Sequence, residues 1–148
     1  MTYFDESGTW GQNHPVEFPQ NEDFIAGTPF CHAPCMVRRD AYQAVNGYTD
    51  DPRYLRVEDY DLWVKMYTTG FRGQNITEPL YAMRDDRNAF ARRKFRYRIN
   101  EFRVRQKAAR MLHLPFKAYL CAFRPIAVGL LPEKVYQALH QKRLEMLT

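Results

Sequence analysis

Cysteine is scarce in this chain of 148 residues, which contains only Cys31, Cys35 and Cys121. An odd count without a paired framework argues against a disulfide-stabilised secreted scaffold, so we expect reduced thiols and a cytoplasmic protein. Cys31, His32 and Cys35 lie close together, but they match no common zinc-finger spacing and have no evident fourth ligand. We therefore predict no metal site at these residues.

Long hydrophobic runs are also missing. The longest, residues 118–132, is interrupted by Arg124 and Pro125 and falls short of the ~20 residues that a membrane-spanning helix needs. The first residues show no basic leader followed by an apolar core, and the chain has no internal repeat or low-complexity tract. We expect neither a membrane-spanning segment nor a secretory signal.

The composition is that of a folded protein. Hydrophobic residues make up 45% of the chain and aromatic residues 15%, which is too rich for a disordered segment. The charged fraction of 26% is close to that of ordinary soluble proteins. A chain of this length fits one domain of ordinary size.

The net charge of +5 conceals a division along the chain. Residues 1–86 contain 7 basic and 14 acidic residues and so carry a charge of −7. Residues 87–117 contain 11 basic residues and one acidic residue, a charge of +10, and the remainder carries +2. An acidic body followed by a basic arm suggests an anionic partner for the arm.

Local sequence signals predict a mixture of strands and helices. The first 30 residues indicate short extended pieces around a turn at "DESG", and residues 35–38 indicate a short strand before a helix at 40–46. Gly47 is expected to end this helix in a left-handed cap. A second helix is expected over residues 57–70, and Gly70 is its left-handed cap.

The remaining chain is predicted to change from strand to helix. Residues 71–84 suggest an edge strand or two short strands. From about residue 88 the pattern is helical to the end, with breaks at Pro115, Pro125 and Pro132.

Three carboxylates, those of Glu58, Asp59 and Asp61, open the second helix. On a helical wheel Asp59 shares the apolar stripe with Trp63 and Met66, whereas Glu58 and Asp61 point to other sides. Acidic residues in a first turn can simply complement the helix dipole, which suits Glu58 and Asp61. A carboxylate on an apolar stripe pays a desolvation cost unless a polar or catalytic group meets it, so Asp59 is the functional candidate.

The stretch "PFCHAPCMVRRDAYQAVNGYTDDPRYLRVEDYDLWVKMYTTGFRGQNITEPLYAMR" resembles the second half of a family 2 glycosyltransferase of the GT-A type. The matching features are a His before an apolar segment ending in Arg-Arg, a short helix ending in Gly-Tyr, the block Glu-Asp-Tyr-Asp-Leu-Trp, and "EPLY". The likeness covers about residues 24–86, and the flanking segments resemble members that build bacterial surface polysaccharides.

The resemblance implies an α/β fold, the C-terminal portion of a GT-A (nucleotide-diphospho-sugar transferase) fold with a largely helical tail. In that family the first half binds the nucleotide through an Asp-x-Asp metal motif, and no such motif or Gly-rich phosphate loop precedes the matched region here. We therefore expect residues 1–86 to be the acceptor-side part of the catalytic domain, and residues 87–148 a basic helical extension. A fragment of this kind would be inactive without the donor-binding half.

The resemblance also assigns roles to individual residues. It implies a hexosyl transfer from a nucleotide-sugar to a glycan or lipid-linked acceptor, inverting, with Asp59 as the general base and Glu58 orienting the acceptor or the base. His32, Arg38 and Trp63 are the candidate substrate-binding residues. His32 has a second interpretation as a half-buried polar group in a loop, and Arg38 as a solvated arginine. A divalent Mn or Mg ion is expected in the full-length enzyme, with ligands mostly outside this chain.

The basic segment 88–113 has two apolar stripes about 180° apart on a helical wheel. One stripe can pack on the acidic body, and the other needs a further partner. That partner could be the following helices, a second copy in a homodimer, or an anionic membrane at its cytoplasmic face. We expect no nucleic-acid binding, because the body is acidic and no nucleic-acid module is recognisable.

A function of another class remains open. A non-catalytic module that binds a glycan or an anionic membrane would also explain an acidic body with a basic, aromatic-rich arm. Replacement of Asp59 by Asn separates the two hypotheses, because only the enzyme depends on this carboxylate for turnover.

Overall fold

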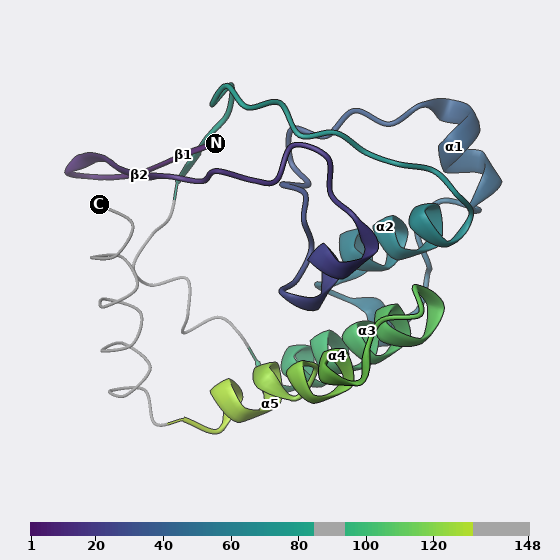
Figure 1. The fold of residues 1–148 in the computed structure, drawn as a ribbon. Coiled ribbons are helices and arrows are strands. Elements are labelled where there is room, and N and C mark those ends of the chain that lie inside the picture. The colour runs from purple at the N-terminus through teal and green to yellow at the C-terminus, as the bar shows by residue number, and fades with distance from the viewer. Residues whose placement is uncertain (85–93, 132–148) are drawn as a thin grey trace.

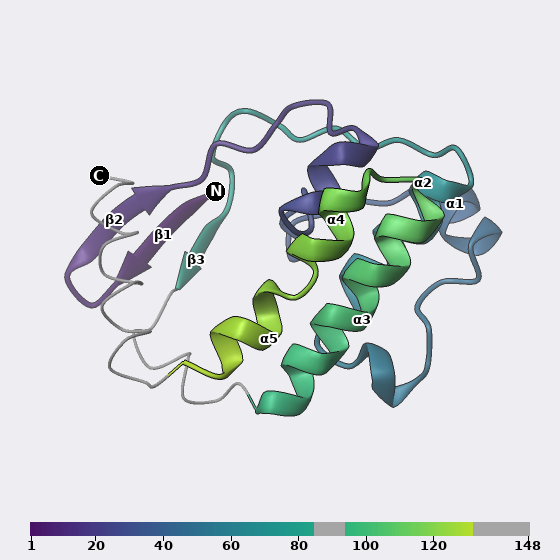
Figure 2. The ribbon, with the colours of Figure 1, turned by 60° about the horizontal axis from the view of Figure 1, so that its bottom comes forward.

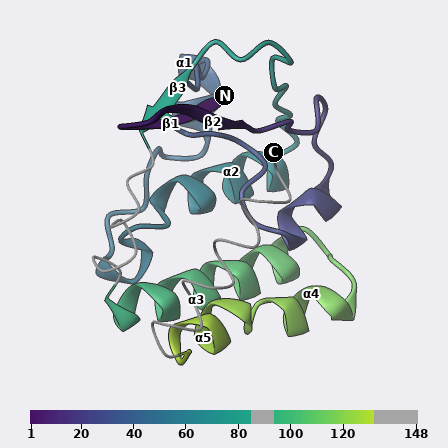
Figure 3. The same ribbon diagram turned by 90° about the vertical axis from the view of Figure 1, so that its left-hand side faces the viewer.

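The computed structural model describes residues 1–84 and 94–131 (Figure 1). A small sheet lies to one side of the helices (Figure 2), and the helices form successive layers, with α4 and α5 outermost (Figure 3). The elements follow in the order β1 (Thr2–Asp5), β2 (Gly8–Gln12), the 3-10 helix η1 (Asn21–Ile25), α1 (Arg39–Ala44), the 3-10 helix η2 (Pro52–Tyr54), α2 (Glu58–Thr68), β3 (Ala82–Arg84), α3 (Phe95–Met111), α4 (Phe116–Cys121) and α5 (Arg124–Gly129).

The sheet joins the start of the chain to the segment before residue 85. Its strand order is β2-β1-β3, with β1 antiparallel to β2 and parallel to β3. Thr2 lies opposite both Gln12 and Ala82 in the two registers. The predicted hairpin around "DESG" is confirmed. The predicted edge strand is confirmed only over the three residues of β3, because most of residues 71–81 is irregular.

Helices α1 and α2 lie close to their predicted positions. The strand predicted at residues 35–38 is wrong, because this segment is irregular and Met36 is 95% exposed. Gly47 adopts a φ of 56° after α1, and its N–H donates to the carbonyl of Tyr42 at 2.9 Å. A Cβ at Gly47 would lie 2.7 Å from the Tyr42 ring, so both the backbone and the packing require glycine there.

The helical part of the chain is divided at the predicted prolines. Pro115 occupies the N-cap position of α4, and Pro125 lies in the first turn of α5. The helix predicted after Pro132 lies outside the described residues. Within the described ranges, no helix is long and apolar enough to cross a membrane.

One hydrophobic core joins α2 to α3. The buried face of α2 includes Leu62, Val64 and Tyr67, and α3 contributes Val104 and Ala108. Residues of both predicted parts, 1–86 and 87–148, therefore share this core. Their division into two domains stays a prediction.

The two apolar stripes of the basic segment are mostly covered by the chain itself where the structure describes them, although Phe95 is 44% exposed. One side of α3, with Val104 and Ala108, is buried against the body. The other side contacts α4 and α5, and the rings of Phe102 and Phe123 lie 4.8 Å apart. Of the three partners considered for the second stripe, the following helices are the one observed.

Asp61 links α2 to α3 through charge. Its side chain is completely buried, and Oδ1 accepts a hydrogen bond from Nζ of Lys107 on α3 at 2.5 Å. Oδ2 accepts one from Thr49 Oγ1 at 2.6 Å and lies 3.9 Å from Nζ of Lys65. Asp61 lies in the first turn of α2, as expected for a residue that complements the helix dipole, but the expectation that it is a surface group is wrong. The wheel placed it on the side of Lys65, but α3 covers that side.

The Asp61–Lys107 ion pair predicts a large stability effect. Asp61→Asn should lower the free energy of unfolding by about 3 kcal/mol, because it leaves the Lys107 ammonium without its buried counter-charge. Asp40→Asn is the matched control, because Asp40 pairs with Arg38 at 3.5 Å on the surface and should matter little. Urea denaturation of both variants measures the difference, and equal stabilities would contradict the assignment.

Candidate functional site

The first turn of α2 presents two carboxylates that are not used in ion pairs within the described residues. Val57 at the N-cap position offers no capping side chain, so acidic side chains complement the amino end of the helix. Asp59 is half-buried, and its Oδ1 accepts a hydrogen bond from the backbone N–H of Tyr60 at 2.8 Å. Glu58 is also half-buried, and its Oε2 has no hydrogen-bond partner in the described part of the chain.

Asp59 lines a cavity of about 650 Å³ between the start of α2, the loop after η1 and α3. The cavity is rich in groups that can hydrogen-bond or carry charge, which is unlike a simple packing void. Its lining residues are Gly27, Thr28, Arg56, Val57, Asp59, Tyr60, Tyr97, Arg98, Glu101 and Arg105. Asp59 is half-buried beside this cavity, which is compatible with its predicted place on the apolar stripe of the helix.

Two of the predicted substrate-binding residues, His32 and Trp63, lie beside each other, and Tyr48 contacts His32. Nε2 of His32 lies 3.0 Å from the Tyr48 hydroxyl, and the His32 ring lies 5.9 Å from the ring of Trp63. Burial is the main cause of a raised pKa of Tyr48, and the neighbouring groups Tyr42, Asp59 and Glu58 raise it further. The carboxylates of Asp59 and Glu58 therefore lie near enough to Tyr48 to disfavour its ionised form.

Trp63 is buried but keeps an unused donor. Its side chain is 6% exposed and packs with a ring separation of 5.3 Å against Phe30. Its indole Nε1 is buried and has no hydrogen-bond partner among the described residues. A buried donor without an acceptor costs free energy, so this N–H is poised for a ligand acceptor.

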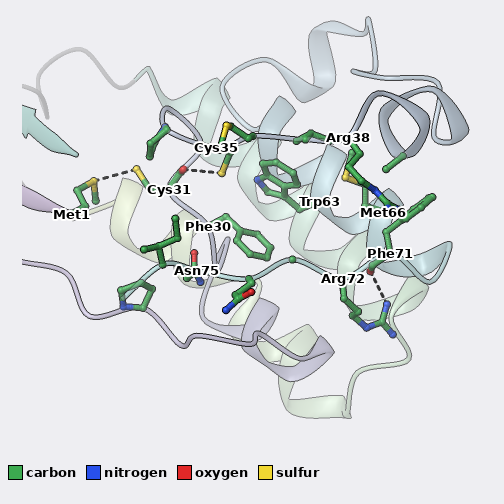
Figure 4. Close-up of a pocket in the computed structure, with 18 of the residues that line it drawn as sticks. Met1, Phe30, Cys31, Cys35, Arg38, Trp63, Met66, Phe71, Arg72 and Asn75 are labelled. Carbon is green, nitrogen blue, oxygen red and sulfur yellow. Dashed lines mark hydrogen bonds between the residues drawn. The ribbon is translucent and has the colours of Figure 1, made fainter. Parts of the chain in front are cut away.

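Trp63 lines a different, larger cavity of about 920 Å³, whose lining does not include Asp59 (Figure 4). Arg38 lines the same cavity, although its side chain is exposed. Cys35 lies on the wall, and burial together with the charges of Cys31 and Asp59 raises the pKa of its thiol to about 11. A thiol of this kind is a weak nucleophile at neutral pH.

The described residues contain no group of three or more His, Cys, Asp or Glu side chains that could hold a metal ion. Asp59 and Glu58 therefore have no third carboxylate, His or Cys beside them in this part of the chain to complete a site for a divalent cation.

Sequence reasoning missed Tyr48. The signal was present in the Gly-Tyr pair after α1, which was noted only as part of the resemblance. The left-handed turn at Gly47 directs the chain so that Tyr48 reaches His32. Arg38, in contrast, pairs with Asp40 rather than with any other candidate residue in the described ranges.

Because the indole N–H of Trp63 has no partner among the described residues, we predict that replacing Trp63 by Phe has little effect on stability. Trp63→Phe should change the free energy of unfolding by less than about 1 kcal/mol, because loss of the unpaired buried N–H offsets the lost ring area. Tyr67→Phe is the matched control, since the Tyr67 hydroxyl donates to the carbonyl of Pro19 at 3.0 Å, and its loss should cost more, about 1–2 kcal/mol. Chemical denaturation compares the two, and a loss of about 3 kcal/mol for Trp63→Phe would show that the indole has a partner.

Comparison with curated proteins finds two relatives. A Bacillus subtilis protein, EpsE, whose name provisionally assigns it to the glycosyltransferases, is 38% identical over 144 residues, which is 97% of this chain and 52% of EpsE. An Escherichia coli enzyme named UDP-Gal:alpha-D-GlcNAc-diphosphoundecaprenol beta-1,3-galactosyltransferase is 27% identical over 117 residues, which is 78% of this chain and 42% of that enzyme.

The chain thus spans about half the length of the curated relatives it matches. No family model matches the chain. No solved structure matches it significantly. The mixed α/β architecture is compatible with a portion of a glycosyltransferase. The two relatives confirm that the chain is similar to a carboxyl-terminal portion of a glycosyltransferase.

Proposed function

We propose that the chain forms the acceptor-side part of an inverting, family 2 glycosyltransferase of the GT-A type, which moves a hexosyl group from a nucleotide-sugar to an acceptor. The observation that carries the proposal is the position of Asp59, half-buried in the first turn of α2 and beside a cavity that several charged residues line. The similarity to two proteins named as glycosyltransferases supports the same reaction class.

Asp59 acts as the general base in this proposal. Its carboxylate takes the proton from the acceptor hydroxyl as that oxygen forms a bond to the anomeric carbon, and the bond from that carbon to the nucleotide diphosphate breaks. The hydrogen bond from the Tyr60 N–H fixes one carboxylate oxygen and leaves the other for the acceptor. Helix α2 is held on both sides by the core, which keeps the base in place.

In this proposal the acceptor is positioned by Glu58 together with three ring-bearing residues, His32, Tyr48 and Trp63. The Oε2 atom of Glu58 and the Nε1 atom of Trp63 are an unpaired acceptor and an unpaired donor, and a sugar hydroxyl can satisfy either. The imidazole of His32 and the hydroxyl of Tyr48 add a second hydrogen-bonding pair at 3.0 Å. Arg38 is proposed to meet an anionic part of the substrate from the wall of the larger cavity.

The acceptor is proposed to be a glycan or a lipid-linked sugar diphosphate. The E. coli relative's name describes such an acceptor, a sugar linked to diphosphoundecaprenol. The divalent Mn or Mg ion expected for the diphosphate leaving group has no ligand set in the described residues, so most of its ligands are proposed to lie outside this chain.

Donor binding is proposed to depend on residues outside this chain, because the relatives are about twice as long as the region matched. We expect the 148 residues alone to release no sugar from radiolabelled nucleotide-sugars. Transfer by this chain alone would show that the donor site has been misplaced.

Asp59→Asn tests the role of the base in a full-length enzyme that contains this chain. Transfer should fall by about 10²- to 10⁴-fold, because asparagine cannot accept the acceptor proton. Donor affinity and the unfolding midpoint should be unchanged. Initial-rate kinetics and calorimetric donor binding measure these quantities.

Asp40→Asn, a neutralisation on the exposed face of α1, is the control and should keep normal turnover. If Asp59→Asn retained turnover comparable to the control, the carboxylate would not be the base. The chain would then fit better as a binding module.

A further inference from the structure

The helices that cover α3 have an unusual distribution of side-chain sizes. Backbone geometry stays helical from α4 into α5, since both Ala122 and Phe123 have right-handed helical φ and ψ values. The N–H of Ala122 bonds to the carbonyl of Ala118, and the N–H of Ala127 to that of Phe123. Residues 116–130 can therefore be placed on one helical wheel.

The inner face of this helical unit is built from small residues. Ala118, Ala122 and Pro125 are buried, and Gly129 shares their side of the wheel. A Cβ at Gly129 would lie 3.0 Å from the Arg98 side chain on α3. Small residues at this contact allow α3 to approach closely. Among the large apolar side chains of the unit, Phe123 also contacts α3, with its ring 4.8 Å from that of Phe102.

Several large apolar residues of the unit are exposed on the other side. Their spacing of four, three, four and three residues places them within about 80° on the wheel, on the side opposite the small residues. The exposed fractions of the four large side chains are given in brackets, and Ala127 is also exposed. The set consists of Phe116 (75%), Leu120 (60%), Phe123 (53%), Ala127 and Leu130 (71%). We call this set the outer stripe. An ordinary surface helix has the reverse arrangement, with its apolar side inward.

The surroundings of the outer stripe are strongly basic. Residues 94–131 contain nine Lys and Arg residues and a single acidic residue, Glu101, which is ion-paired with Arg105 at 3.0 Å. Lys117 and Arg124 are exposed and lie seven residues apart on one flank of the outer stripe.

Helix α3 adds a second row of cations. Arg96, Arg103 and Arg110 are exposed and also recur every seven residues. They lie about 100° around the helix from Phe102, which contacts α5 through Phe123. The row therefore borders the side of α3 that α4 and α5 cover (Figure 3).

We propose that the outer stripe and its flanking cations form a surface that binds anionic lipid membranes. Exposed Phe and Leu side chains enter the boundary between headgroups and acyl chains, while Lys and Arg meet lipid phosphates. From the sequence, an anionic membrane was one of three alternative partners for the second apolar stripe of segment 88–113. In this proposal the apolar part of that contact belongs to α4 and α5, because most apolar side chains of α3 are packed against the rest of the chain.

The positive charge around the outer stripe favours an anionic membrane over a second copy of the chain as its binding partner. Two copies joined through the outer stripe would bring two strongly basic surfaces together without intervening carboxylates from the described parts of residues 94–131. An anionic bilayer instead matches both the apolar stripe and the positive flanks. This surface is independent of the proposed transfer reaction, so it can be tested without any sugar substrate.

Vesicle co-sedimentation of the full chain tests the proposal. Wild-type protein should bind vesicles of phosphatidylcholine with about one third phosphatidylglycerol, and should bind pure phosphatidylcholine much more weakly. Phe116→Ser combined with Leu120→Ser should weaken binding at least about tenfold, because two inserted apolar side chains are lost. Phe18→Ser is the matched control, since Phe18 is 57% exposed outside the outer stripe, and it should bind normally.

The cations are tested separately. Lys117→Gln and Arg124→Gln should each weaken binding about fivefold at low salt, corresponding to ~1 kcal/mol per charge near the bilayer surface. Arg39→Gln, on α1, is the control for removal of an exposed positive charge. Raising the salt from about 50 mM to about 500 mM should weaken wild-type binding in the same direction.

Circular dichroism and thermal unfolding check that all variants fold. We expect them to fold, because every substituted side chain is exposed. Failure of the wild-type chain to bind anionic vesicles would overturn the proposal, as would equal binding by the Phe116→Ser/Leu120→Ser variant. Sedimentation equilibrium supplies the other decisive result. A dimer that this double variant abolishes would assign the outer stripe to a second copy instead.

Discussion

The buried ion pair between Asp61 and Lys107 is the interaction on which the arrangement of the helices depends. It joins α2, which carries the candidate base, to α3, which carries the basic surface. The carboxylate is fully buried and is also held by Thr49, while Lys107 lies with its Nζ 4.8 Å from the Tyr54 ring centroid. A buried charge of this kind is tolerated only with its partner in place, so it fixes which face of α2 meets α3.

This anchoring separates two neighbouring carboxylates by role. Asp61 faces α3 and is used in the fold, whereas Asp59 lies two residues earlier, which rotates it by about 200° around the helix toward another side. Asp59 keeps only a local hydrogen bond to the next backbone N–H. Its remaining hydrogen-bonding capacity is available to a substrate, which is why the proposed chemistry is assigned to it.

The sequence predicted the helices well and the sides of α2 only in part. Periodicity and glycine caps located α1 and α2, because those signals are local. The role of Asp61 could not be predicted, since its partner Lys107 is 46 residues away and belonged to a segment expected to be a separate arm. The wheel identified the stripe of Asp59 and Trp63 but treated the opposite side as solvent, although a helix between two layers has no solvent side.

The site and the basic surface show the same dependence on long-range contacts. His32 and Trp63 were each predicted as substrate-binding residues without a known contact between them. The contact between Tyr48 and His32 depends on the left-handed turn at Gly47 and could not be predicted from local sequence. The two stripes of α3 correctly indicated two packed sides. The exposed apolar stripe lies one layer further out, where the small residues of α4 and α5 face inward.

The central claim is that Asp61 supports the fold while Asp59 performs the chemistry. The most direct test is sugar transfer by a full-length enzyme carrying Asp61→Asn together with Lys107→Met, measured beside Asp59→Asn. Because the double replacement removes both charges of the buried pair, it should fold and retain most of the transfer rate, whereas Asp59→Asn should remain inactive. A folded double variant as inactive as Asp59→Asn would contradict the account, because Asp61 would then be needed for the reaction itself.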